Sequence, residues 1–125
     1  MILLLILLLT PYQFSYTVPE PIKEPIIEER IERTISETLD YYSDLRGLDK
    51  DLIRKIAFCE SSLNEKAIGD QNRAFGLFQI HISLHNVSKE CALNADCSTD
   101  WATKQIAQGR GRLWTCWRTL ALKDK

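Results

Sequence analysis

The chain has 125 residues and a formal net charge of −1 at pH 7, and this length predicts one domain. The charge is uneven, because residues 19–51 carry ten acidic and five basic side chains, whereas residues 52–125 carry seven acidic and eleven basic ones. The C-terminal part is therefore mildly basic, which suits an anionic polymer. Because no nucleic-acid-binding motif accompanies these charges, we expect no nucleic-acid partner.

The N-terminus is an apolar run in which Met1 is followed by eight Ile and Leu residues, before Thr10 and Pro11. The run is too short for a helix that spans a bilayer, which needs about 20 residues. It matches the hydrophobic region of an export signal, although no Lys or Arg precedes it and no clear cleavage site follows it. We interpret residues 1–17 as an export signal or an N-terminal anchor. The protein is then periplasmic or extracellular, and an anchor would contact the membrane.

Two further segments precede the main domain. Residues 18–25 contain three prolines, which fix the backbone and remove amide donors, so an extended spacer is predicted. Residues 26–46 are predicted to form an amphipathic helix, because apolar side chains recur at helical spacing. These are Ile27, Ile31, Ile35, Leu39 and Tyr42. The stripe is too short to indicate a coiled coil, so we expect this helix to pack on its own domain and the protein to be a monomer.

A second helix is predicted after Gly47, with Asp49 placed to cap its first amides. Its apolar residues recur at three- and four-residue spacing, and Glu60 lies on the same stripe. Burial on that stripe would raise the pKa of Glu60, so that this carboxyl group can donate a proton near neutral pH. The alternative is a glutamate in the last turn of a surface helix, with its charge in solvent.

The residues after this helix predict a turn and one strand. Residues 69–73, Gly-Asp-Gln-Asn-Arg, have the composition of a turn. Residues 75–82 are apolar and are predicted to form a strand, within which Gly76 would allow a ligand or another backbone to approach closely. The C-terminal part then predicts a helix over residues 99–107, with Thr99 as its cap, and a packed turn or short helix over residues 113–117.

Four cysteines allow three disulfide pairings if the chain is exported. We favour Cys91 with Cys97, because five intervening residues make a local loop, and Cys59 with Cys116, which would tie the Glu60 helix to the C-terminal segment. Such bracing is expected, because only about 75 residues remain for the compact unit, and small domains bury little surface. The alternative is four reduced, buried thiols.

Neither a metal nor a cofactor is predicted. The sequence has no C-x-x-C pair, and its two histidines, His81 and His85, are not spaced as in a zinc finger. The chemistry expected of this chain therefore rests on its own side chains.

Three short motifs carry a resemblance to a known family. They are Glu-Ser-Ser-Leu-Asn at residues 60–64, Ala-Ile-Gly at 67–69 and Phe-Gly-Leu-Phe-Gln-Ile at 75–80. In residue type, order and approximate spacing they resemble the signature of the lytic transglycosylases of the lysozyme-like superfamily. The resemblance covers roughly residues 48–117. It implies a small α+β fold, mostly α, over residues 47–125, with helices around a catalytic cleft and a short β-tongue.

The resemblance also implies roles for particular residues. Glu60 would be the sole catalytic acid/base, and the substrate would be the glycan strand of bacterial peptidoglycan, cleaved between MurNAc and GlcNAc. Five aromatic side chains are available for stacking on sugars, and we expect three of them to lie in the core. The five are Phe75, Phe78, Trp101, Trp114 and Trp117. The predicted substrate-binding residues are Ser61, Ser62, Phe75, Gly76, Leu77, Gln79 and Trp101.

A second carboxylate, which glycosidases usually need, is hard to identify. Asp70 is the nearby acid that can face the cleft, and Glu65 is expected to point to solvent. His81 stands where the goose-type lysozymes, which the motif also resembles, have an aspartate. All four tyrosines precede the motif, which leaves Tyr42, or none, for the tyrosine that many family members place near the catalytic glutamate.

These departures leave several functions open. A transglycosylase needs only one acid/base, because an internal hydroxyl of the muramic sugar replaces water and leaves a 1,6-anhydro ring. The alternatives are a goose-type-like lysozyme that hydrolyses the same bond and a non-catalytic peptidoglycan-binding protein. A disulfide-braced interaction domain with a chance motif is a third.

Overall fold

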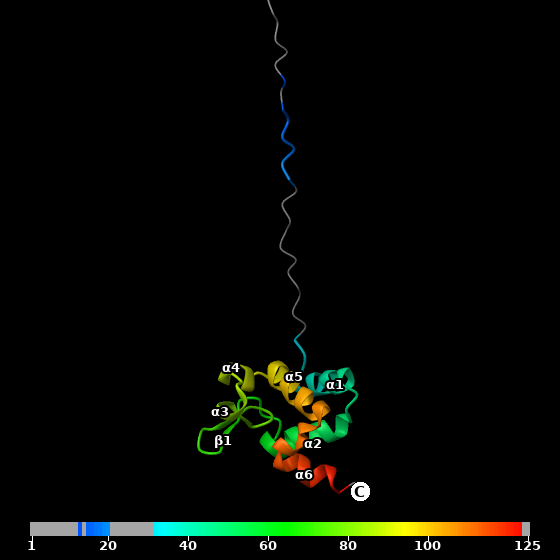
Figure 1. Ribbon diagram of the computed structural model, residues 1–125, viewed down its shortest axis with the longest axis vertical. Coiled ribbons are helices and arrows are strands. Elements are labelled where there is room, and N and C mark those ends of the chain that lie inside the picture. The colour runs from blue at the N-terminus through cyan, green and yellow to red at the C-terminus, as the bar shows by residue number, and fades with distance from the viewer. Residues whose placement is uncertain (1–12, 14, 21–31, 124–125) are drawn as a thin grey trace, which may run out of the picture. The chain divides into compact units, whose positions relative to one another are not determined.

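The computed structural model describes residues 13, 15–20 and 32–123 (Figure 1). The chain divides into two units, Met1–Arg30 and Ile31–Lys125, and every helix and strand of the described residues belongs to the second. Most of the predicted export signal or anchor, and residues 21–25 of the predicted spacer, lie outside the described part. No helix that the structure describes is long and apolar enough to cross a membrane.

The first helix, α1 (Ile35–Leu45), begins later than the sequence predicts. Thr34 Oγ1 accepts a hydrogen bond from the Glu37 amide (3.2 Å), and a Glu37 carboxylate oxygen accepts one from the Thr34 amide (2.8 Å). This capping box starts the helix at Ile35, so the predicted helix over residues 26–46 is wrong for residues 32–34, while residues 26–31 lie outside the described part of the chain. The helix packs on α2 and α5, as expected for a helix of the domain itself.

The second helix, α2 (Lys50–Ser61), has the predicted cap and the predicted buried stripe. An Asp49 carboxylate oxygen accepts hydrogen bonds from the amides of Asp51 (2.9 Å) and Leu52 (3.4 Å). Ile53, Ile56 and Ala57 are fully buried. The helix therefore carries Glu60 in its last turn, as predicted.

Three short strands form an antiparallel sheet in the order β1 (Ile68–Gly69), β2 (Ala74–Phe75) and β3 (Ile80–His81). Ile68 pairs with Phe75, and Phe75 pairs with Ile80. The predicted single strand over residues 75–82 is therefore two strands. The reason is Gly76, which has φ +78° and turns the chain between them.

The remaining helices are α3 (Ile82–His85), α4 (Lys89–Ala92), α5 (Ala95–Gln105) and α6 (Thr115–Ala121). The π-helical segment η1 (Ile106–Arg110) and the 3₁₀ turn η2 (Gly111–Leu113) join the last two. Helix α5 is capped by Asn94, whose side-chain oxygen accepts from the Cys97 amide (2.9 Å). The predicted cap, Thr99, is wrong, because Thr99 is buried inside this helix.

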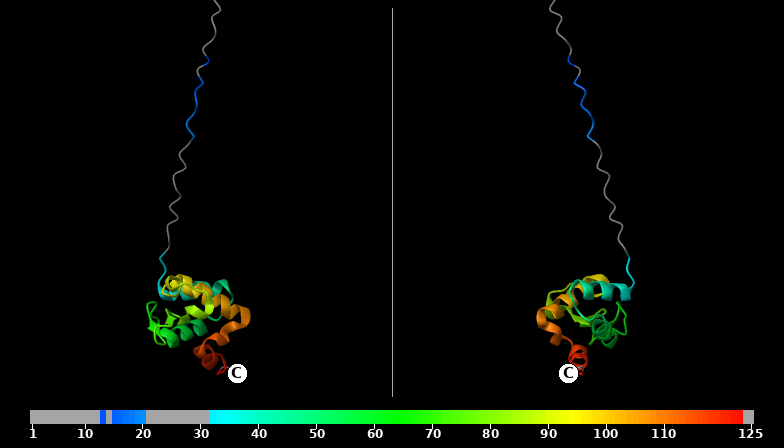
Figure 2. Two further views of the ribbon diagram at one scale, coloured as in Figure 1. Left: turned by 60° about the vertical axis from the view of Figure 1, so that its left-hand side comes forward. Right: turned by 90° about the vertical axis from the view of Figure 1, so that its right-hand side faces the viewer.

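Helix α5 connects the two sides of the folded unit, because it contacts both α1 and α4 (Figure 1). Helix α6, drawn in orange to red at the lower end of the folded unit in Figure 2, contacts α2. The described unit is thus mostly helical with one small sheet, and the predicted α+β, mostly α class is confirmed.

Both favoured disulfides are present. Cys59 is bonded to Cys116 across 57 positions of sequence, and Cys91 is bonded to Cys97 across six. No cysteine is free. The first bond joins α2 to α6, and the second joins α4 to the first turn of α5. Structural disulfides persist in oxidising compartments, so they fit an exported protein.

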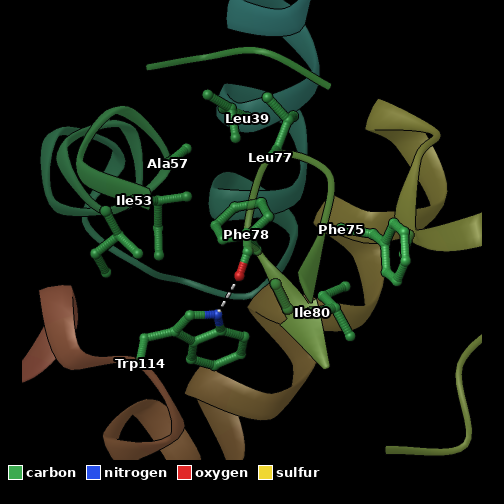
Figure 3. Packing of buried hydrophobic residues seen from close by; sticks show 11 residues of the cluster. Leu39, Ile53, Ala57, Phe75, Leu77, Phe78, Ile80 and Trp114 are labelled. Atoms are coloured by element: carbon green, nitrogen blue, oxygen red, sulfur yellow. Dashed lines mark hydrogen bonds between the residues drawn. The ribbon is translucent and has the colours of Figure 1, made fainter. Parts of the chain in front are cut away.

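The core lies between α1, α2, the sheet and the C-terminal segment (Figure 3). Phe75, Phe78 and Trp114 are at most 5% exposed, which confirms that three of the five candidate aromatic residues belong to the core. The Trp114 indole Nε1 donates a hydrogen bond to the Phe78 carbonyl oxygen (2.8 Å). This bond fixes the C-terminal segment to the loop between β2 and β3.

Trp114→Phe is expected to lower the free energy of unfolding by about 1–3 kcal/mol, because it leaves the buried Phe78 carbonyl without its donor. Urea unfolding at fixed pH measures this loss. Trp117→Phe is the control, since no hydrogen bond of the Trp117 indole is found within the described part of the chain. Equal losses in both variants would mean that the Trp114 bond contributes nothing.

Candidate active site

A cavity of about 260 Å³ opens beside the C-terminal end of α2. Three of the predicted site residues line it, namely Glu60, Gln79 and Trp101. The other residues of the lining come from the sheet and its first turn, from the end of α3, and from the segment that leads into α6. They are Asp70, Ala74, Ile80, His81, His85, Leu113, Trp114 and Thr115.

Glu60 is half-buried in this cavity. Its Oε1 accepts a hydrogen bond from the Cys116 amide at 3.4 Å. Burial raises the pKa of Glu60 above its usual value, while the Cys116 amide and the nearby His81 lower it by smaller amounts. A carboxyl group with a raised pKa retains its proton closer to neutral pH, which suits a general acid.

The raised pKa of Glu60 predicts a pH-dependent stability. Because the folded state favours the protonated form, the stabilising contribution is complete below the unfolded-state pKa, about 4.3, and is lost as the pH rises through the higher folded-state pKa. Glu60→Gln, which is neutral throughout, is therefore expected to be more stable than the unmodified protein at about pH 7 and nearly equal to it at about pH 3.5. Thermal unfolding at both pH values measures the difference. A difference that does not change with pH would contradict the raised pKa.

Gln79 has its side-chain donors largely engaged within the protein. Its Nε2 donates to the carbonyl oxygens of Gly76 (3.0 Å) and Ala67 (3.4 Å). Gly69 lies so close that a Cβ there would be 2.2 Å from the Gln79 Oε1. The amide therefore braces the loop around β2, and what it offers a ligand in the cavity is chiefly its oxygen.

Asp70 and His81 lie side by side in the same cavity. His81 Nε2 lies 3.3 Å from one Asp70 carboxylate oxygen, and Arg73 lies 3.0 Å from the other. Asp70 is in the β1–β2 turn and His81 ends β3, so the sheet brings them together. The cavity thus contains a second carboxylate, which Arg73 and His81 contact.

Aromatic residues form one wall of the cavity. The Trp101 ring lies 6.0 Å from the Trp114 ring and 5.3 Å from the His85 ring, between centroids. Burial lowers the pKa of His85, which favours its neutral form. Trp101 is only partly buried, so part of its ring remains available to a sugar.

Five predicted substrate-binding residues do not line the cavity, namely Ser61, Ser62, Phe75, Gly76 and Leu77. Phe75 and Leu77 are buried in the core, because the turn at Gly76 directs both apolar side chains inward. Ser61 Oγ donates to the Ala57 carbonyl within its own helix (3.0 Å). Ser62 is the exposed left-handed cap of α2. For Phe75 and Leu77 burial excludes direct contact with a glycan, so these two predictions are corrected.

The expectation for Glu65 is corrected, and of the two alternatives left for a tyrosine near Glu60, Tyr42 or none, the structure favours none. Glu65 does not point freely to solvent, since its carboxylate accepts a hydrogen bond from the Ala95 amide at the start of α5 (3.0 Å). Tyr42 does not line the cavity, because its hydroxyl donates to Asp96 (2.9 Å) between α1 and α5. Burial and Asp96 raise the pKa of Tyr42 to about 12. Neither residue therefore assists Glu60 directly.

The cavity residues that the sequence analysis did not place in the site include Ala74, Ile80, His85, Leu113 and Thr115. The two C-terminal ones lie more than 50 positions from Glu60, and the Cys59–Cys116 pairing was the one sequence signal that linked the two regions. Within the described residues no group of three His, Cys, Asp or Glu side chains is placed to hold a metal ion.

A mostly helical unit with a short antiparallel sheet, in which a helix delivers a half-buried glutamate to a cavity, defines a lysozyme-like protein. Residues 37–110 match the family model described as the Transglycosylase SLT domain, and the chain belongs to this family. The resemblance to the lytic transglycosylases is thereby confirmed. Membership supports a peptidoglycan-cleaving function of the lytic-transglycosylase type in general. Comparison with curated proteins and with solved structures found no match.

Proposed function

We propose that the protein is a lytic transglycosylase that cleaves the glycan strand of bacterial peptidoglycan between MurNAc and GlcNAc, with Glu60 as acid and then base. Glu60 protonates the bridging oxygen, and the bond from this oxygen to the muramic sugar breaks. The internal hydroxyl of that sugar then attacks the same carbon, and Glu60 takes up its proton. The product is a 1,6-anhydro ring, and no water is consumed.

The observation that carries this proposal is the environment of Glu60. Its carboxyl group is half-buried at the end of α2, faces a cavity and has a raised pKa. One residue then holds the proton that the first step needs and regains a proton in the second. The partly exposed Trp101 supplies a surface for sugar stacking, and the Gln79 side-chain oxygen supplies a hydrogen-bond acceptor in the lining of the same cavity.

A second candidate is lysozyme-type hydrolysis of the same bond. The specific observation that favours it is Asp70, a second carboxylate in the lining of the cavity that holds Glu60. In an inverting glycosidase such a group activates water. Against it, both Asp70 carboxylate oxygens already have partners, one in Arg73 and the other in His81.

Product analysis separates these functions. Purified protein is incubated with peptidoglycan, and the ends of the released fragments are identified by mass. Anhydro ends are the expected result. Reducing ends would show hydrolysis, and an intact glycan that sediments with the protein would show a binding protein without turnover.

The place of action follows from the same proposal. Peptidoglycan lies outside the cytoplasm, and two disulfides suit an oxidising compartment, so we place the protein in the periplasm or outside the cell. The mildly basic part of the chain, residues 52–125, suits a polymer with anionic groups. Neither a cofactor nor a metal has a step in this reaction.

A further inference from the structure

The segment from Gly111 to Cys116 closes one side of the cavity. It lies beyond residues 37–110, which match the family, yet it contributes Leu113, Trp114 and Thr115 to the lining. The Cys116 amide also donates to the Glu60 carboxylate. One wall of the site is therefore built by a part of the chain that the family match does not include.

Two ties hold this segment in place. Within it, the buried Trp114 is fixed to the core by its hydrogen bond to Phe78. At its end, the Cys59–Cys116 disulfide joins it to α2. Beyond that bond, α6 contains no fully buried residue, and only Trp117 and Leu120 are partly buried against the core.

Each cysteine of the Cys59–Cys116 disulfide lies next to the Glu60 carboxyl group. Cys59 is the residue before Glu60, and Cys116 is the residue whose amide donates to the Glu60 Oε1. Its Cα atoms are 6.1 Å apart. The covalent bond therefore fixes the position of the donor relative to the carboxylate that receives the hydrogen bond.

We propose that the Cys59–Cys116 disulfide is a positioning element of the active site, which holds the Gly111–Cys116 wall against Glu60 and makes glycan cleavage dependent on oxidation. This proposal rests on the proposed function, because it assigns Glu60 the reacting proton. Reduction by a dithiol transfers two electrons and two protons, breaks the Sγ–Sγ bond to give two thiols and converts the dithiol to its own disulfide. Trp114 keeps its place in the core, whereas Thr115 and Cys116 are released from Glu60.

The second disulfide supplies a matched control. Cys91–Cys97 closes a loop between α4 and α5, and neither cysteine lines the cavity. In the variant Cys91→Ala/Cys97→Ala, reductant acts on the Cys59–Cys116 bond alone. In Cys59→Ala/Cys116→Ala, reductant acts on the other bond alone.

The test measures peptidoglycan cleavage by both double variants before reduction with dithiothreitol, after it and after reoxidation with oxidised glutathione. Cys91→Ala/Cys97→Ala is expected to lose activity about tenfold or more on reduction and to regain it on reoxidation. Cys59→Ala/Cys116→Ala is expected to show the low activity in both states. A reduced Cys91→Ala/Cys97→Ala protein that remains fully active would overturn the proposal.

Two further readouts separate positioning from general stability. On reduction, the loss of activity is expected in kcat more than in KM. The basic limb of the pH profile for cleavage is also expected to move to lower pH. The reason is that release of the Gly111–Cys116 wall exposes Glu60 to water and so removes burial, the main cause of its raised pKa. Unchanged kcat and an unmoved limb would overturn a positioning role.

Hydrogen exchange gives a readout that does not need cleavage. On reduction of Cys91→Ala/Cys97→Ala, faster exchange is expected at residues 115–121, with α1, α2 and α5 unchanged. If the unmodified protein cleaves no glycan, the proposed function fails, and hydrogen exchange alone tests whether the Cys59–Cys116 disulfide holds the Gly111–Cys116 wall in place. If cleavage depends fully on Glu60 but is unchanged by reduction, the positioning role of the disulfide fails and the proposed function stands.

Discussion

Glu60→Gln is expected to reduce peptidoglycan cleavage by about 100-fold or more, because general acid catalysis contributes about 10²–10⁴ in rate. The amide has nearly the same shape as the carboxyl group and can still accept the hydrogen bond from the Cys116 amide. It has no proton to donate to a glycosidic oxygen. The release of soluble glycan fragments, measured under substrate saturation, gives the effect on kcat.

Glu65→Gln is the matched control for this change. Glu65 lies five positions further along the chain and is hydrogen-bonded to the start of α5, and it does not line the cavity. Its replacement is expected to leave cleavage within about twofold of the unmodified protein. If Glu60→Gln keeps similar activity, Glu60 is not the acid.

Gly76→Ala is expected to produce the largest loss of stability, about 3 kcal/mol. A Cβ at this position would lie 1.7 Å from the Ala92 carbonyl oxygen, which is backbone and cannot rotate away. The position also has φ +78°, which disfavours any side chain. Because Gly76 turns the chain between β2 and β3, we expect the cavity to lose its shape together with the stability. Chemical unfolding followed by circular dichroism measures the effect.

Gly47→Ala separates backbone strain from steric clash. Gly47 has a similar φ of +64°, but no atom lies within 4 Å of its Cβ position. Gly47→Ala is expected to lower the free energy of unfolding by only about 1 kcal/mol. Equal losses at both glycines would mean that the loop around Gly76 moves away from Ala92 and that this close approach is not required.

The placement of Glu60 was predictable because its signals are local. The Asp49 cap and the three- and four-residue spacing of Ile53 and Ile56 fix where α2 begins and which side of it is buried. The Cys91–Cys97 pairing also followed from short spacing. These signals depend on residues close together in sequence, which one helix or one loop can express. The Cys59–Cys116 pairing joins residues 57 positions apart, and it was one of several possible pairings until the structure showed it.

The predicted start of α5 was wrong because two suitable capping residues lie five positions apart in the sequence. Both Asn94 and Thr99 are good N-terminal caps by residue type. The choice is made by tertiary structure, since Glu65 from the loop after α2 accepts a hydrogen bond from the Ala95 amide and so stabilises the earlier start. No local pattern contains that contact.

The lining of the cavity was predictable only in part. Phe75 and Leu77 lie within the family motif, but they contribute to it as core residues around a turn. Leu113 and Thr115 reach the cavity because α6 is tied to α2, a contact between regions far apart in the chain. Residue type alone does not distinguish a side chain that packs beneath a cleft from one that faces it.

The role of Glu60 as proton donor is tested most directly by titrating its side-chain carboxyl carbon with ¹³C nuclear magnetic resonance in the unmodified, oxidised protein. The expected midpoint lies above 4.5, the usual value, and coincides with the basic limb of the pH profile for cleavage. A midpoint at or below 4.5 would show a carboxylate that is already ionised near neutral pH, and would contradict Glu60 as the proton donor.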